Sequence, residues 1–288
     1  MTYETKTGKI YPETSNIVNL RLTANQYLDN QLDFLTAAEQ LDNNFPTGHY
    51  LIAELGILES IKRQSSKSLN LSTKYLEEIY QNPIAPYDLK FLTEFRLHQL
   101  NLIDLIYIQK KAPNFNEMAL FQTNNTNLIQ RYSSVLKQLD QQNKYHISEQ
   151  YRQLYGHFNE LLLITLINRR YQSTNCFALP TLINDDHGGD LLNKTVETSF
   201  DIKIFSTKLD ELHKIQLKTS RNNLTSFLNY NPLNIKLVFF KEDLSRQHEN
   251  NISKNITTEL INDQFQPNES TSKILNFRYK KFFQRITY

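Results

Sequence analysis

Apolar side chains in the first half of the chain repeat at helical spacing. This spacing predicts helices over residues 23–41, 50–63, 72–80, 87–111 and 127–141. Pro46, Pro83 and Pro113 stand between these segments, where proline ends or separates helices. We therefore predict an all-α region over residues 23–142, of the bundle type.

The pattern changes in the second half of the chain. An apolar helix is predicted over 148–170, and short segments of strand character follow it at 175–182, 199–205, 212–218 and 235–240. A turn at 207–211 joins the second and third strands into a hairpin, and a short helix is predicted at 221–230. The order α-β-β-β-α-β predicts an α+β or α/β domain with a mixed sheet. We expect a helical region at 1–145 and a second domain at 146–288.

The length and net charge of the chain exclude few classes of protein. The chain has 288 residues, which suffices for two medium-sized domains with their own cores. Its 32 basic and 30 acidic residues give a net charge of +2, which does not by itself indicate a nucleic-acid-binding protein. Basic residues recur in the predicted strands and around them: Lys203, Lys208, Lys214, Lys218, Arg221, Lys236 and Lys241. They form either a solvated surface or a face that meets phosphates, and both readings stay open.

The cysteine content and the apolar runs bear on location. Cys176 is the only cysteine, so the chain has no internal disulfide, which favours a reducing compartment. The first residues lack the apolar run of a secretory signal. Apolar runs such as 161–167 are far shorter than the roughly 18 residues of a membrane span. We expect a cytoplasmic protein with no membrane segment.

Four residues of the second half carry candidate chemistry. Asp201 opens the second strand, and Gln216 and Lys218 lie two positions apart on the third, so they face the same side of that strand. The hairpin would bring Asp201 beside them. Glu160 interrupts the otherwise apolar second half of the preceding helix.

These groups suit phosphodiester hydrolysis. Asp201 offers a carboxylate and Gln216 an amide oxygen, and hard divalent cations such as Mg²⁺ (or Mn²⁺) are held by oxygen ligands while keeping several waters. Such a cation polarises the phosphate and helps to generate the nucleophile. Lys218 would orient the attacking water or stabilise charge on the phosphate. Lys214, nearer the turn, is expected to be solvated.

The segment Gln216-Leu217-Lys218-Thr219, preceded by Asp201 and by a helix with Glu160, resembles the PD-(D/E)XK nuclease superfamily, in its Q-x-K-T form. The resemblance covers residues 150–241. It implies a restriction-endonuclease-like core in which Asp201, Gln216 and Glu160 serve the metal and Lys218 is the catalytic lysine. Two departures stand out: Gln216 replaces the glutamate of many members, and no Pro-Asp pair precedes the lysine motif.

Other candidates carry weaker signals. Asp190 competes with Asp201 for the metal role, and the loop at 185–190 is better explained as a polar turn than as a metal cluster. His157 is better explained as a packing or capping residue, and Cys176 as a buried cysteine. The aromatic and basic stretch at 277–283 either stacks on bases or packs as an amphipathic segment.

Three functions remain open on the sequence. The first is a Mg²⁺-dependent nuclease acting on DNA, whose N-terminal helices position substrate, bind a partner or form a homodimer. The second is a catalytically silent module of the same fold that binds DNA or a protein partner. The third is an interaction scaffold built from the helical region.

Overall fold

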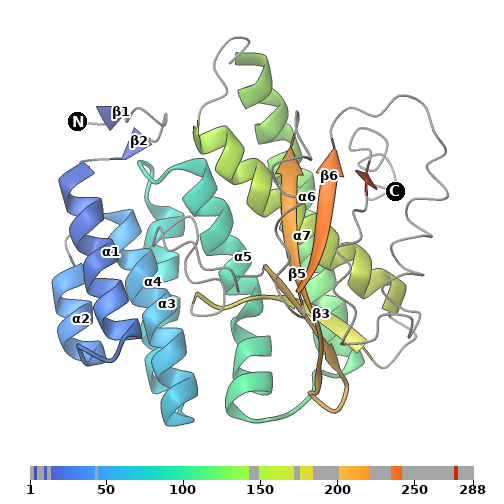
Figure 1. Cartoon of the computed structure of the whole chain (residues 1–288), viewed down its shortest axis with the longest axis horizontal. Helices are drawn as coiled ribbons and strands as arrows, with labels where there is room; N and C mark the ends of the chain where they lie inside the picture. The colour runs from blue at the N-terminus through green and yellow to red at the C-terminus, as the bar shows by residue number, and fades with distance from the viewer. Residues whose placement is uncertain are drawn as a thin grey trace. The chain divides into compact units, whose positions relative to one another are not determined.

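The first half of the chain folds into successive helices (Figure 1). The computed structural model describes residues 3–4, 10–11, 14–42, 45–142, 149–171, 176–183, 201–220, 235–241 and 276–277, and all statements below concern these. Two short strands, β1 (Tyr3–Glu4) and β2 (Ile10–Tyr11), pair antiparallel. The helices are α1 (Thr14–Leu28), α2 (Phe34–Leu41), α3 (Pro46–Arg63), α4 (Lys67–Gln81), α5 (Tyr87–Ile103) with a π-helical turn η1 (Asp104–Ile108), α6 (Phe115–Gln142) and α7 (Glu149–Tyr171). The predicted helical region is therefore confirmed.

The chain divides into two units. The helical unit comprises residues 1–158 with 182–194, and the strand unit comprises 159–181 with 195–288. We expected a division at 145/146, whereas the units divide within α7, between Phe158 and Asn159. Each unit is described by itself.

The single helix expected over 23–41 is wrong, because the chain breaks it into α1 and α2. Asn30 adopts a left-handed backbone conformation with φ of 57°, which a right-handed helix cannot continue through. Asp33 then caps α2, since its side chain accepts a hydrogen bond of 3.0 Å from the backbone N–H of Thr36. Local capping therefore overrides an apolar periodicity that runs across the break.

Other helices begin earlier than the apolar spacing indicates. Pro46 stands in the first turn of α3, where its missing N–H costs nothing. Asn114 and Glu117 form a reciprocal capping box before α6: each side chain accepts the other's backbone N–H, at 3.0 and 2.6 Å. The α-helix predicted over 87–111 is wrong at its C-terminal end, because α5 ends at Ile103 and the next turn, Asp104–Ile108, is π-helical.

Helix α3 lies at the centre of the helical unit and packs against α1, α2, α4 and α5. One of its faces joins a cluster with α1 and α2 that includes Leu20, Phe34 and Leu51. Another joins α4 and α5 in a second cluster that includes Leu76 and Leu89. α3 is consequently buried along most of its length.

The strand unit contains a sheet in the order β3-β4-β5-β6-β7. Strands β3, β5 and β6 are labelled in Figure 1. Strands β3 (Cys176–Pro180), β4 (Ile202–Ser206) and β5 (Glu211–Ser220) form an antiparallel meander, so the predicted hairpin is confirmed. On its other side β5 pairs parallel with β6 (Ile235–Lys241), which pairs parallel with β7 (Asn276–Phe277). The chain combines helices with a sheet whose first three strands form an antiparallel meander, so it belongs to the α+β class.

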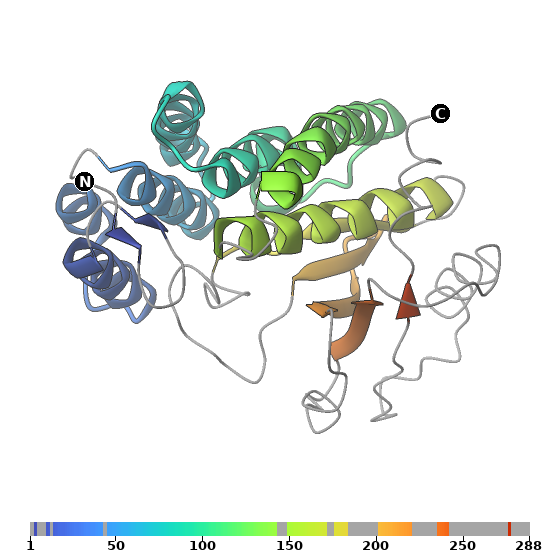
Figure 2. The same ribbon diagram turned by 90° about the horizontal axis from the view of Figure 1, so that it is seen from above.

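The second half of α7 lies along this sheet (Figure 2) and is fastened to the outer edge of β3. The Asn168 amide N–H donates to the carbonyl of Ala178 at 2.8 Å, and its oxygen accepts from the Ala178 N–H at 2.6 Å. One side chain thus satisfies both backbone groups of an edge residue, which would otherwise be open to pairing with another strand.

Several expectations lie outside the described residues. These are the predicted helix at 221–230, the polar segment at 243–272 and most of the final segment. Within the described part of the chain, no helix combines the length and apolarity that crossing a membrane requires.

Candidate functional site

The β4–β5 hairpin fixes where the candidate residues stand. Ile202 pairs with Ile215 and Lys203 with Lys214, both antiparallel. Continuing this register by one residue sets position 201 opposite position 216. Residues directly opposite each other in an antiparallel pair share a face, and position 218 shares it as well because it lies two residues on. Backbone positions 201, 216 and 218 therefore belong to one face of the sheet.

Asp201 is held at the start of β4 by the end of β3. The Thr181 backbone N–H donates to the Asp201 carbonyl at 3.0 Å, and the Thr181 hydroxyl approaches the same oxygen at 3.3 Å. These bonds continue the β3–β4 ladder past its last registered pair, Pro180 with Ile202. Asp201 precedes the strand rather than opening it as we expected, but its backbone is anchored in line with it.

Gln216 and Lys218 lie on β5, a central strand flanked by β4 and β6. Their backbone partners on β6 are Leu237 and Phe239. Pairing on both sides fixes the path of β5, so the positions of the two residues depend on the sheet rather than on a loop. Their side chains fall outside what the structure describes.

Glu160 lies on α7 in the same unit and is partly buried. It sits between the fully buried Asn159 and the buried run Leu161–Ile164, as the sequence pattern indicates. Its placement on the helix agrees with expectation, and its proximity to Asp201 stays a prediction.

A cluster that sequence reasoning missed lies on the same hairpin. Glu211 contacts two lysines: its Oε2 lies 3.3 Å from Lys203 Nζ, and its Oε1 lies 3.1 Å from Lys214 Nζ. Lys203 is only 9% exposed, an unusual environment for a lysine. We predicted no partner for either lysine from the sequence. Lys214, which we expected to be solvated, is about a third accessible and also forms an ion pair.

The donor set suits a weakly held, water-rich cation. Asp201 would supply one carboxylate and Gln216 one amide oxygen, and Mg²⁺ accepts one or two carboxylates with waters completing its shell. In the part of the chain that the structure describes, no group of three or more His, Cys, Asp or Glu side chains is arranged to hold a metal. A site here would therefore depend on Gln216 and on bound water.

Of the weaker candidates, Cys176 stands at the start of β3 and is partly buried. Burial raises the pKa of its thiol, which disfavours the reactive thiolate. His157 is partly buried on α7. The loop at 185–190 and the stretch at 278–283 lie outside the described residues.

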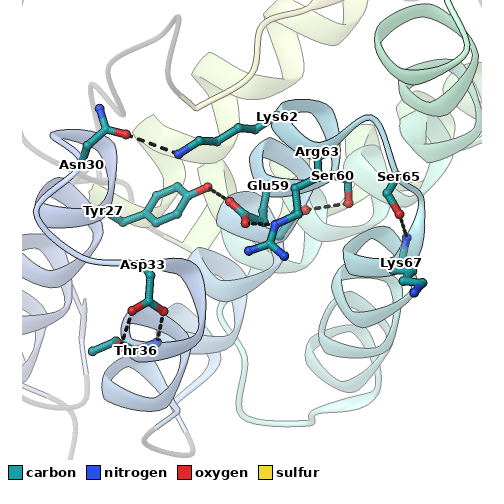
Figure 3. Close-up of polar contacts among 11 residues, drawn as sticks. Tyr27, Asn30, Asp33, Thr36, Glu59, Ser60, Lys62, Arg63, Ser65 and Lys67 are labelled. Atoms are coloured by element: carbon teal, nitrogen blue, oxygen red, sulfur yellow. Dashed lines mark hydrogen bonds and ion pairs between the residues drawn. The ribbon is translucent and has the colours of Figure 1, made fainter.

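The helical unit holds buried carboxylates that the sequence did not single out. Tyr27 of α1 donates to Glu59 of α3 at 2.8 Å, and Arg63 contacts the same carboxylate from the next helical turn (Figure 3). Burial, together with the Glu59 carboxylate, raises the pKa of Tyr27. Each charge has a partner inside the unit, which is the arrangement of a structural network.

No family model, no curated protein and no solved structure matches this chain.

Proposed function

We propose that this chain is a metal-dependent nuclease that hydrolyses phosphodiester bonds in DNA, with α7 and strands β3 to β6 as a restriction-endonuclease-like core built on a mixed sheet. One observation carries the proposal: the β4–β5 register assigns positions 201, 216 and 218 to one face. An acid, an amide and a lysine on one face fit the chemistry that the Q-x-K-T resemblance implies.

The residues would divide the work by their chemistry. Asp201 and Gln216 would hold Mg²⁺ (or Mn²⁺), with Glu160 supporting the site through bound water. When bound, the cation supplies charge stabilisation on the phosphate and a nucleophile at neutral pH. Lys218 would hold the attacking water or the developing negative charge of the phosphate in line with that site. The lone cysteine supports a cytoplasmic location as part of the same proposal.

A cleavage assay with matched variants tests the proposal. The full chain would be incubated with single-stranded, double-stranded and branched DNA in Mg²⁺, Mn²⁺ or EDTA. Asp201→Asn and Lys218→Ala should abolish metal-dependent cutting. Asp210→Asn and Lys208→Ala make the same charge changes at exposed turn positions of the same hairpin and should cut normally. Cutting that survives in Asp201→Asn, or that EDTA leaves intact, would sink the proposal.

A second function is favoured by one residue. Gln216 stands where a carboxylate would add a charge to the metal site, and its neutrality favours a silent module that binds DNA or a protein partner. Calorimetry separates the two: a chain that takes up no Mn²⁺ at millimolar concentration yet binds DNA is the silent module.

A further inference from the structure

Glu211 reaches Lys203 and Lys214 because of a β-bulge. The register shifts between Ile204, which pairs with His213, and Phe205, which pairs with Glu211, so Leu212 is the extra residue. Without the shift, Glu211 would share a face with His213 and Ile215. With it, Glu211 shares the face of Phe205, Lys203 and Lys214. We call Lys203, Glu211 and Lys214 the hairpin triad.

The hairpin triad sets two lysines against one carboxylate. Lys203 and Lys214 are direct cross-strand partners, and like charges in that relation repel each other. The Glu211 carboxylate contacts both amines and reduces this repulsion. Lys203 is nearly buried, whereas about a third of the Lys214 side chain is accessible, so Lys214 is the member that an incoming anion can reach.

The hairpin triad shares its sheet face with Asp201 and Gln216. Lys203 lies two residues beyond Asp201, and Lys214 two residues before Gln216. Two residues advance along a strand by about 7 Å. Neighbouring phosphates of a nucleic acid strand are separated by a comparable distance. A strand with one phosphate at Asp201 and Gln216 would therefore bring its next phosphate to Lys214.

We propose that Lys214, backed by Lys203, binds the phosphate adjacent to the one that is cut, and that Glu211 holds Lys214 in place until that phosphate replaces it. This inference rests on the proposed nuclease function and narrows its substrate. It predicts a polynucleotide with a phosphate flanking the scissile one.

Binding and cleavage would be measured separately. Binding uses fluorescence anisotropy of a labelled DNA oligonucleotide with the full chain in EDTA over a range of NaCl concentrations. Lys214→Ala should weaken binding several-fold and lower the slope of log K against log[salt] by about 0.9 for duplex DNA or about 0.7 for a single strand. Glu211→Gln should tighten binding, because it removes a competing negative charge. Lys208→Ala, in the exposed turn of the same hairpin, should behave as wild type.

Cleavage compares a dinucleotide, which has only the scissile phosphate, with a trinucleotide that adds a flanking one. The wild type should prefer the trinucleotide in kcat/KM. Lys214→Ala should lose that preference mainly through KM, with kcat little changed. A triad that serves only the fold would lower the melting temperature of the variants and leave both the preference and the salt slope unchanged.

The outcomes distinguish the two proposals. If Asp201→Asn abolishes cutting but Lys214→Ala matches Lys208→Ala in affinity, slope and preference, the flanking-phosphate site is overturned and the nuclease stands. Weaker binding by Glu211→Gln at an unchanged melting temperature also overturns the site. If the wild type cuts nothing, the nuclease is overturned, and the salt slope alone decides whether Lys214 contacts a phosphate.

Discussion

Arg96 of α5 and Glu54 of α3 form a buried ion pair, with Nε 2.7 Å from Oε1. Glu54 is 1% exposed, and Arg96 also donates to Gln99 at 2.6 Å. Burial lowers the pKa of Arg96, but Glu54 and Tyr50 together more than reverse this, so the pKa lies above its ordinary value. The pair therefore joins two helices that are distant in sequence inside the core of the helical unit.

Breaking this pair should destabilise the chain strongly. Arg96→Met leaves the Glu54 carboxylate buried without its cation, which costs about 3–5 kcal/mol of unfolding free energy. The double variant Glu54→Leu/Arg96→Met removes both charges and should recover most of that loss. Urea unfolding followed by circular dichroism measures both.

The control for this prediction is an exposed ion pair. Lys74 and Glu78 lie 3.7 Å apart at i,i+4 on α4, and Lys74→Met should cost under about 1 kcal/mol. Equal losses in Lys74→Met and Arg96→Met would contradict the role given to burial.

Gly56 allows α3 and α4 to approach closely. A Cβ built at Gly56 would lie 2.4 Å from Ser72 Oγ and 3.2 Å from the Ser68 carbonyl oxygen. The Ser72 hydroxyl cannot turn away without cost, because it donates to the Ala53 carbonyl at 2.7 Å. Gly56→Ala should therefore lower the unfolding free energy by about 1–3 kcal/mol, the range for overpacking.

Gly156 of α7 is the matched control, since nothing lies within 4 Å of a Cβ added there. Gly156→Ala should stabilise by up to about 1 kcal/mol through helix propensity. Thermal unfolding of the two variants should shift in opposite directions, and a shift in the same direction would refute the close-approach argument.

Sequence periodicity predicts the helices and strands better than it predicts which of them pack together. Alternation in 199–205 and 212–218 correctly predicted the β4–β5 hairpin, because a two-residue period is a local property. The Glu54–Arg96 pair spans 42 positions, and only the packing of α3 on α5 creates it. In the sequence, Glu54 is a carboxylate within an apolar helical run, but this pattern does not indicate which residue pairs with it.

The sequence likewise predicts only part of the candidate site. Strand parity placed Gln216 and Lys218 on one face, and the hairpin register brought position 201 to them. We expected Glu211 to end the turn at 207–211, whereas it is the first residue of β5, and the bulge at Leu212 sets it on the face of Lys203 and Lys214. A bulge depends on how the turn closes, so alternation in the sequence gives no sign of it.

The Asn168 side chain should be needed to protect the edge of β3. Asn168→Ala removes both bonds to Ala178 and leaves a buried N–H and C=O without partners, at a cost of about 2–4 kcal/mol. Amide hydrogen exchange of Ala178 should accelerate, and the variant should aggregate more readily through the opened edge. Asn101→Ala, at an exposed position of α5, is the control and should do neither.

Buried tyrosines should make the chain sensitive to alkali. Burial raises the pKa of Tyr27, Tyr50 and Tyr132, so the folded chain keeps these phenols protonated at pH values where the unfolded chain releases the protons. The unfolding free energy should be unaffected by these groups below pH about 10. Above that pH it should fall by about 1.4 kcal/mol per pH unit for each such tyrosine, until the folded pKa is reached.

Tyr50→Phe tests this dependence, because Tyr50 is 3% exposed. Its unfolding free energy, measured by urea at a series of alkaline pH values, should decline less steeply than that of the wild type. Parallel curves for the two proteins would show that Tyr50 ionises equally in both states.

Gln216→Glu should strengthen metal binding at the proposed site. Position 216 lies opposite position 201 by register, so a second carboxylate there adds a charged oxygen ligand beside Asp201. We expect Mn²⁺ affinity to rise about tenfold, corresponding to about 1.4 kcal/mol, as read by calorimetry. Thr207→Glu adds the same charge at an exposed turn position and should leave the affinity unchanged. If the Mn²⁺ affinity of both variants rises equally, the effect comes from the added charge at any position, and the pairing of positions 201 and 216 at a metal is wrong. If Gln216→Glu alone gains, and Asp201→Asn removes that gain, the two positions act on one cation.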